Sequence, residues 1–436
     1  ADPRAAAPLE EPSRGRRWAV LLAVSAAMFA NYYVFDALYP VAPLLQARLG
    51  FTDAQIGLLD TAYNVAALLT LVGGGLLIDR LGTAPATLLF SAVGAAGAAL
   101  VALLPAAFPA HAAAAMAAGR FVLGVGSELF IVSATTVVSR WFRGKEISFA
   151  LAVQLFIARL GSWLADRSPD LARGLFDDWR PPLLVAAGFG ALWLALAAVY
   201  AALERAAAGR LAVRGAAAPD RLVPADLVRY GRSYWWVVGI CVAFYSTVFP
   251  FRTFANLYLI QAHGVAPDEA GSLKSILPLV SMFGMPVFGL VADRFGRRAL
   301  LLVLGSALLV PPFLLMAYTP APLALSMVVL GVAFALVPAV LWPVVTWLVP
   351  DARLGSAYAL MTFCQQVGWA GMSWAIGAAN DAAGASEANP AGWLPATWML
   401  AGLAAVGLLF SLLLWRAERG PGGHGLEAPV PHRHAA

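Results

Sequence analysis

Apolar runs long enough to cross a lipid bilayer recur along almost the whole chain. The hydrocarbon core of a bilayer is about 30 Å thick and needs roughly 20 helical residues to cross it. Hydrophobic residues make up 61% of this sequence and charged residues 12%, against about 45–50% and about 25% in soluble globular domains. We therefore predict an all-α, multi-pass membrane protein with twelve spans, over residues 18–46, 53–78, 85–104, 112–139, 145–166, 181–203, 234–261, 268–292, 298–318, 322–349, 354–379 and 393–415.

An internal repeat divides these spans into two sets of six. The segment "GGLLIDRLG" (74–82) recurs as "FGLVADRFG" (288–296), which pairs Asp79 with Asp293 and Arg80 with Arg294 at an offset of 214 residues. A weaker match at an offset of 207 supports the same division. Because six is even, the two copies are parallel. The expected domains are a polar tail at 1–17, a six-helix bundle at 18–203, a cytoplasmic linker at 204–233, a second six-helix bundle at 234–416 and a polar tail at 417–436.

The basic residues predict the orientation in the membrane. Most of the 29 lysines and arginines fall in the tails, the linker and the short loops on one side. The loops on the other side hold only Arg48, Arg167, Arg173 and Arg180. Because lysine and arginine are enriched in cytoplasmic loops, both termini are expected to be cytoplasmic. The composition, rich in alanine and arginine, looks bacterial, so we expect the inner (cytoplasmic) membrane.

Several classes of site are not expected. The two cysteines, Cys241 and Cys364, lie in separate apolar runs, and the five histidines form no ligand set, so no metal or cofactor is predicted. No nucleophile motif or pair of catalytic carboxylates indicates an enzyme. The scattered basic residues do not indicate nucleic-acid binding. The expected partners are the lipid bilayer and a small solute, and the chain is expected to be a monomer.

Two ionisable residues fall near the middle of predicted spans. Glu128 and Arg159 lie about 18 to 21 Å along their helices from the basic residues that mark the cytoplasmic ends. A charge at this depth costs at least about 2.5 to 3.5 kcal/mol and persists where it meets water, a partner or a ligand. The two residues either form an ion pair between neighbouring helices or face a ligand in one cavity. At the offset of 207, the residues equivalent to Glu128 and Arg159 in the second half are Ala335 and Gln366. A purely structural pair could have been repeated in both halves, so its absence from the second half favours a ligand.

Other polar residues in the spans are weaker candidates. Asp36 faces either the cavity or the outer interface, and Tyr63 and Asn64 hydrogen-bond either a substrate or neighbouring helices. Asp36 and Asp60 both lie toward the outer half of their spans, where water is expected to keep carboxylates charged.

Three basic residues also fall within predicted spans. Arg252 and Lys274, near outer ends, are expected to snorkel or to pair outside the membrane. Arg120 lies two helical turns outward of Glu128 on the same face, where a pairing or outer-gate role is expected rather than direct binding.

The span count, together with "GLLIDRLG" and "GLVADRFGRR" in the two equivalent loops, resembles the major facilitator superfamily. The resemblance implies that the acidic and basic residues of these loops help to close a cytoplasmic gate. The first copy lacks the later basic residues, so its gate contacts are expected to be weaker. The implied gate residues are Asp79, Arg80, Asp293, Arg294, Arg297 and Arg298.

A closer resemblance covers most of the chain from the second span to the eleventh. "GRFVLGVGSE", "SRWFRGKEISFALAVQLFIARLGS", "VFPF", "LWP" and "LGSAYA" are similar to the branch of this superfamily that includes the lysosomal dipeptide uniporter of animals. The matching residues of that branch line the central site, which implies a substrate role for Glu128, Arg159 and Trp342. With Tyr245, Trp342 is expected to form an apolar or cation–π wall.

Three functions follow from these features. The first is a facilitator that moves small zwitterionic peptides by alternating access, as a uniporter. The second is proton-coupled transport of a small organic anion or drug, with Glu128 as the proton carrier. The third is a membrane receptor or scaffold that keeps the fold without transporting, because fold does not establish function.

Overall fold

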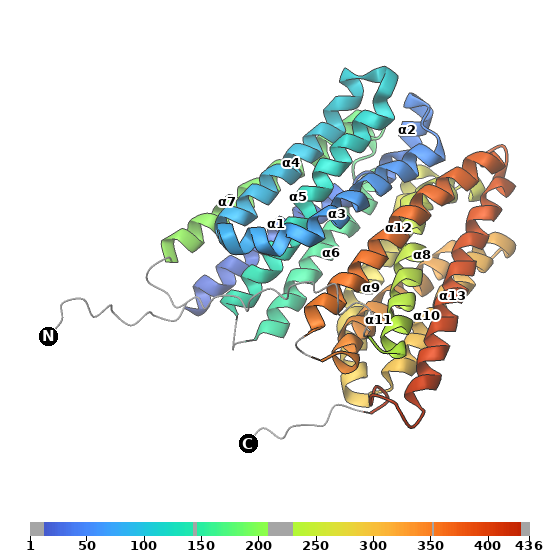
Figure 1. Ribbon diagram of the computed structural model, residues 1–436. Coiled ribbons are helices and arrows are strands. Elements are labelled where there is room, and N and C mark those ends of the chain that lie inside the picture. The colour runs from blue at the N-terminus through green and yellow to red at the C-terminus, as the bar shows by residue number, and fades with distance from the viewer. Residues whose placement is uncertain (1–12, 143–145, 208–229, 351–352, 429–436) are drawn as a thin grey trace.

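The computed structural model describes residues 13–142, 146–207, 230–350 and 353–428, apart from the side chains of residues 71–76, 79 and 148. Long helices fill nearly all of this part of the chain (Figure 1). In the first half they are α1 (Arg14–Asp36), α3 (Asp53–Leu81), α4 (Thr83–Ala107), α5 (Ala112–Trp141), α6 (Ile147–Leu171) and α7 (Arg180–Ala207). In the second half they are α8 (Arg232–His263), α9 (Pro267–Phe295), α10 (Arg298–Tyr318), α11 (Leu323–Leu348), α12 (Leu354–Ala383) and α13 (Leu394–Glu418).

The first predicted span is interrupted before its end. Helix α1 ends at Asp36, and a 3-10 turn, η1 (Tyr39–Val41), leads into the short helix α2 (Ala42–Leu49). Pro40 and Pro43 lie in this segment and have no backbone N–H to continue an α-helical ladder. The expected single run over 18–46 is therefore two helices with a turn between them.

Ten segments of the described chain are long and apolar enough to cross a membrane. Helix α12 falls outside this set because it carries polar residues such as Gln366, and α3 falls outside it because part of its apolar stretch, residues 71–76, is not among the described side chains. The two helices pack against each other. The prediction of an all-helical membrane protein is confirmed, and the count of twelve spans stays a prediction.

The two halves repeat one packing scheme. In the first half, α5 packs on α3 and α4, α7 packs on α1 and α4, and α6 packs on α1. In the second half, α11 packs on α9 and α10, α13 packs on α8 and α10, and α12 packs on α8. The halves meet through α3 with α12 and through α6 with α9, which are equivalent pairs under the same correspondence. The internal repeat of the sequence is thus a repeat of helix contacts.

The first residue of α1 and the last residue of α13 lie at the same end of the molecule (Figure 1), which we call the tail side; the opposite end is the far side. On the far side the halves approach closely. A Cβ added to Gly57 of α3 would lie 2.3 Å from the carbonyl oxygen of Ser373 in α12, and one added to Gly377 would lie 2.3 Å from that of Asp53. Only glycine permits backbones this close, so α3 and α12 are in direct main-chain contact there.

Candidate functional site

A cavity of about 430 Å³ lies between the two halves. This volume is within the range typical of small-molecule sites, about 300 to 1,000 Å³. Its walls come from α1, α3, α5 and α6 of the first half and from α8, α11 and α12 of the second. They are formed by Asn31, Tyr32, Phe35, Asp36, Tyr63, Ser127, Glu128, Ile131, Arg159, Tyr245, Phe249, Arg252, Trp342, Thr362, Gln365, Gln366 and Trp369.

Glu128 lies on one wall in a hydrogen-bonded setting. The Tyr63 hydroxyl is 2.9 Å from Glu128 Oε1 and 2.8 Å from Ser127 Oγ, so its single proton can be donated to either oxygen. Ser127 Oγ donates to Asn31 Oδ1 at 2.7 Å. These contacts fix the orientation of the carboxylate without neutralising its charge.

Arg159 lies between aromatic rings on another part of the wall. Its guanidinium carbon is 4.8 Å from the Phe334 ring centroid and 5.7 Å from that of Tyr32. The Trp342 indole N–H donates to the Tyr245 hydroxyl at 3.0 Å beside it. Trp342 and Tyr245 line the cavity side by side, and the rings that stack on the arginine are those of Tyr32 and Phe334.

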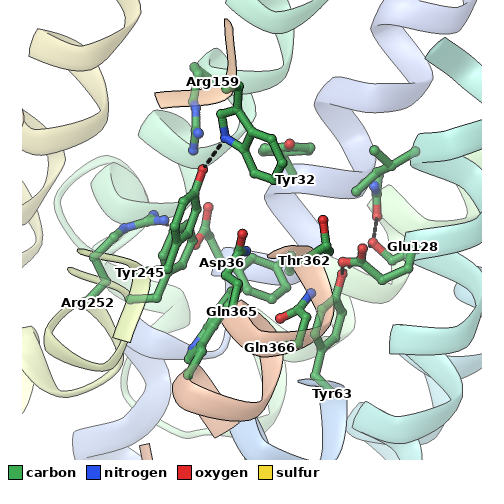
Figure 2. A pocket seen from close by; sticks show the side chains of 17 residues that line it. Tyr32, Asp36, Tyr63, Glu128, Arg159, Tyr245, Arg252, Thr362, Gln365 and Gln366 are labelled. Atoms are coloured by element: carbon green, nitrogen blue, oxygen red, sulfur yellow. Dashed lines mark hydrogen bonds and ion pairs between the residues drawn. The ribbon is translucent and has the colours of Figure 1, made fainter. Parts of the chain in front are cut away.

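No ion pair joins Glu128 and Arg159, and neither has an ion-pair partner elsewhere in the described residues. Figure 2 shows Arg159 and Glu128 at opposite ends of the cavity, with Asp36 and Thr362 between them. The Nε atom of Arg159 is buried and has no hydrogen-bond partner. The alternative of a structural pair between the two helices is therefore not the arrangement that this structure has.

The cavity continues toward the tail side. A second hollow of about 440 Å³ shares Arg159, Tyr245 and Trp342 with the first. Its other lining residues lie on α6, α9 and α11 in the halves of those helices nearer the tail side: Ala152, Leu155, Phe156, Met282, Met285, Pro286, Gly289, Pro338 and Ala339. A solute can thus approach Arg159 from the tail side.

Buried charges close the far side. Arg252 of α8 donates to Asp36 Oδ1 of α1 at 2.8 Å and lies 3.7 Å from Asp166 of α6. Lys274 of α9 lies 2.8 Å from Asp166. All four side chains are at most 1% exposed. The expectation that Arg252 and Lys274 snorkel or pair outside is wrong, because their partners lie inside the protein, across the interface between the halves.

Asp60 of α3 is the centre of a second far-side cluster. It accepts hydrogen bonds from Ser373 at 2.6 Å, from Trp369 at 2.7 Å and from Thr253 at 3.2 Å, all in the second half. From its own half it accepts one from Tyr39 at 3.0 Å.

Arg120 supplies the charge that faces Asp60 at this cluster. Its guanidinium lies 3.8 Å from Asp60, as the expected pairing role requires. Asp60 and Asp36 are therefore buried among protein donors and cations, and the expectation that they face water is wrong.

The predicted gate loops make no polar contact across the halves within the described residues. Arg298 is 3.8 Å from Asp293 in its own half and stacks on Trp347. Arg80 is exposed, Arg294 stacks on Phe295, and Arg297 has a positive φ of 50°. The side chain of Asp79 lies outside the described residues. This arrangement agrees with a tail side where the halves are apart.

The lining of the cavity lacks one predicted residue and includes polar residues that were not predicted. Asn64 does not line it; its amide donates to the backbone carbonyl of Asp60 in its own helix. Gln366, the repeat equivalent of Arg159, does line it, as do Gln365 and Thr362. Sequence reasoning gave these residues no role, although the offset of 207 already indicated that the Gln366 position faces the same way as Arg159.

Sequence reasoning also assigned no role to Asp166. It was read as the last residue of the fifth span, next to Arg167. The one indication of a role for this carboxylate was that two cations in the other half, Arg252 and Lys274, lacked predicted partners inside the protein. No group of three or more His, Cys, Asp or Glu side chains in the described residues is placed to hold a metal ion.

Comparisons with known proteins agree with this architecture. A family profile described as Major Facilitator Superfamily matches residues 24–373 and 251–433. The chain is 27% identical to the human protein named lysosomal dipeptide transporter MFSD1, over 97% of this chain and 91% of that protein. It is 30% identical to the chicken protein of the same name, over 62% of this chain and 63% of that protein. A hexuronate transporter of Bacillus subtilis matches at 22% identity over 79% of this chain and 83% of its own length.

Solved structures share the fold at lower identity. The nucleoside transporter NupG superposes with a TM-score of 0.73, 15% identity, and coverage of 91% of this chain and 99% of that one. A bacterial homologue of the human lysosomal transporter Spinster, in an inward-facing and unoccupied conformation, gives 0.71 and 16% over 93% and 98%. At these identities the similarity shows a shared fold and nothing about the solute.

Proposed function

The chain belongs to the major facilitator superfamily, and from this premise we propose that it is a secondary transporter of small zwitterionic peptides, dipeptides first among them. Its relatives and its fold are those of membrane transporters. The observation that carries the proposal is the pair of half-buried, unpaired, opposite charges, Glu128 and Arg159, at opposite ends of one cavity. We propose no enzymatic activity and no cofactor.

The chemistry of the two ends matches a short peptide. A dipeptide spans about 7 Å between its charged ends. Arg159 offers a planar fork to the carboxylate and can bind it through two parallel hydrogen bonds. Glu128, with one oxygen held by Tyr63, offers its charge to the ammonium group. A free zwitterion neutralises both groups at once, which offsets the cost of leaving each charge half-buried.

The remaining walls support breadth in the peptide side chains. Phe249, Trp342 and Trp369 are apolar surfaces that make no demand on side-chain identity. Tyr63, Tyr245 and Asp36 complete the proposed site, with Asp36 already engaged by Arg252.

We propose alternating access between two bundles, 18–203 and 234–416, that rock about this site. In the described residues the polar contacts between the halves all lie on the far side, so the structure corresponds to a state open to the tail side. The gate loops around Asp293 and Arg298 are proposed to meet the first bundle when the tail side closes.

We further propose that the tail side is cytoplasmic, that the protein is a monomer in the inner membrane, and that it is a uniporter. A cysteine introduced at Ala217 in the linker should be inaccessible to an impermeant thiol reagent in intact cells and reactive after lysis. Labelling from outside would reverse the proposed topology.

The second candidate function is proton-coupled transport of a small organic anion. The similarity to the hexuronate transporter supports it, as does the position of Arg252 on the wall of the same cavity as Arg159. In this function Glu128 carries a proton instead of binding an ammonium group.

A ligand panel separates the two candidates. The Tm of the purified protein should rise on addition of free dipeptides and not on addition of amino acids, sugars or hexuronates. The flux of these solutes into liposomes should follow the same ranking. A response to organic acids without a response to any peptide favours the second function. Binding without flux indicates a receptor.

A further inference from the structure

The fully buried ion pairs between the halves on the far side divide by the sign of their charge, whereas the more exposed pair of Arg173 with Asp268 has the opposite polarity. The acids, Asp36 and Asp166, come from the first half, and the cations that meet them, Arg252 and Lys274, come from the second. Asp60 is different, because Arg120, its cation, belongs to its own half. Opposite charges therefore hold the halves together at α6 with α9 and at α1 with α8.

The internal repeat relates two of these contacts to each other. The offset of 214 that pairs Asp79 with Asp293 also pairs Asp60 of α3 with Lys274 of α9. The offset of 207 that pairs Arg159 with Gln366 also pairs Asp166 of α6 with Ser373 of α12. We call the α3–α12 contact and the α6–α9 contact the two arms of the interface. The contact between Asp60 and Ser373 in the first arm is thus equivalent to the contact between Lys274 and Asp166 in the second.

The two arms differ in what remains when the halves separate. Asp60 would lose Thr253, Trp369 and Ser373 but keep Tyr39 and Arg120. Asp166 would lose both Lys274 and Arg252, the cations that face it in the described chain. Lys274 would lose its carboxylate as well. Separation therefore leaves unpaired charge in the α6 and α9 arm and a balanced pair in the α3 and α12 arm.

We propose that Asp166 and Lys274 are gate residues of the transport cycle: their ion pair holds the far side closed and sets the balance between the two open states. Arg252 joins this pair to the cavity, because it contacts Asp166 and Asp36 and lines the cavity together with Asp36. The inference rests on the alternating-access part of the proposed function and is independent of the identity of the solute.

The test measures distances without any ligand. In a variant with both native cysteines replaced, spin labels at Gly174 and Ala266, exposed far-side positions in different halves, report opening there. Labels at Ala206 and Ala417 report the tail side. The double variant Asp166→Asn with Lys274→Met removes the ion pair and leaves neither charge stranded, so it should still fold.

The double variant should increase the ratio of far-side-open to far-side-closed molecules about tenfold or more, as loss of a close charge pair implies. The tail-side distance should shorten in the same fraction of molecules. Asp178→Asn is the control, because Asp178 is an exposed far-side carboxylate whose one hydrogen bond in the described residues is to the backbone N–H of Trp179 in its own half. It should leave both distributions unchanged.

Wild-type distributions in the double variant would overturn the proposal, as would far-side widening without tail-side shortening. If the distances shift as expected but no peptide binds, the gate stands and the proposed solute is wrong. If peptides bind and the distances do not shift, the solute stands and the gate is wrong.

Discussion

The interface between the halves holds two sets of charged side chains, one fully buried on the far side and one half-buried in the cavity, and only the first set is paired. On the far side, Asp36, Asp60 and Asp166 each meet a cation within 3.8 Å. In the cavity, Glu128 and Arg159 meet no opposite charge in the part of the chain that the structure describes. Because buried charges are normally paired or bound to a ligand, the comparison separates charges that hold the protein together from charges that wait for a solute.

The difference has a geometric origin. The far-side groups lie where α1 meets α8 and α6 meets α9, so closure of the halves supplies their partners. Glu128 on α5 and Arg159 on α6 lie on the cavity wall, where the second half brings an aromatic ring, Phe334, to Arg159 but no opposite charge in the described residues. Stability and binding should therefore respond to different substitutions.

The largest effect is expected from breaking a far-side pair. Asp36→Asn leaves Arg252 without its closest carboxylate, and removing one partner of a buried pair typically costs about 3–5 kcal/mol. The unfolding free energy measured without ligand should fall by that order. Asp293→Asn, at a carboxylate that is 76% exposed, is the control and should change it little. Equal effects of the two variants would remove the distinction between the two sets of charges.

The next largest effect is expected at Arg159. Arg159→Lys replaces a planar fork by a point charge, and hydrogen bonds to charged groups are worth about 1.5–3 kcal/mol each. Dipeptide affinity should fall roughly ten- to a hundredfold. Thermal stability without ligand should stay near the wild-type value, and Arg205→Lys, at an exposed position on the tail side, should change neither quantity. A loss of stability equal to that of Asp36→Asn would assign Arg159 to the structural set.

A smaller effect is expected at Glu128. Glu128→Gln removes the charge but keeps an oxygen that can accept a hydrogen bond, so dipeptide affinity should fall about tenfold. N-acetylated dipeptides, which lack the ammonium group, should bind wild type and variant equally. A variant that binds free dipeptides as tightly as wild type would exclude Glu128 from the ammonium site.

No effect is expected from a proton gradient. Glu128 is engaged by the substrate ammonium in the proposed function, and Asp36, Asp60 and Asp166 are engaged by cations or by donors from the other half. A neutral dipeptide should therefore equilibrate across liposomes without accumulating, with or without an inward proton gradient. Accumulation abolished by a protonophore would contradict uniport and make one of these acids a proton carrier.

The helical fold and the two charged residues of the cavity, Glu128 and Arg159, could be predicted from the sequence. The far-side contacts between the halves could not. Span length and the repeat around Asp79 and Asp293 depend on local composition, which a single chain displays directly. Glu128 and Arg159 could be found because charge within an apolar run is conspicuous.

The partners of Arg252 and Lys274 could not be predicted in the same way. Asp36 is 216 residues away from Arg252, and Asp166 belongs to the other half from both cations, so only the approach of the halves brings these groups within reach. The sequence predicts that Asn64 hydrogen-bonds either a substrate or a neighbouring helix. Neighbours in a helix point about 100° apart, and its side chain returns to its own backbone instead.

The most direct measurement of the central claim is a binding cycle that crosses Arg159→Gln with amidation of the peptide carboxylate. If Arg159 binds that carboxylate, the substitution should weaken the free dipeptide at least about tenfold and leave the amidated dipeptide nearly unchanged, which corresponds to a coupling of about 1.4 kcal/mol or more. Equal losses for both peptides would mean that Arg159 acts on the cavity as a whole and that the two charges are not the two ends of a peptide site.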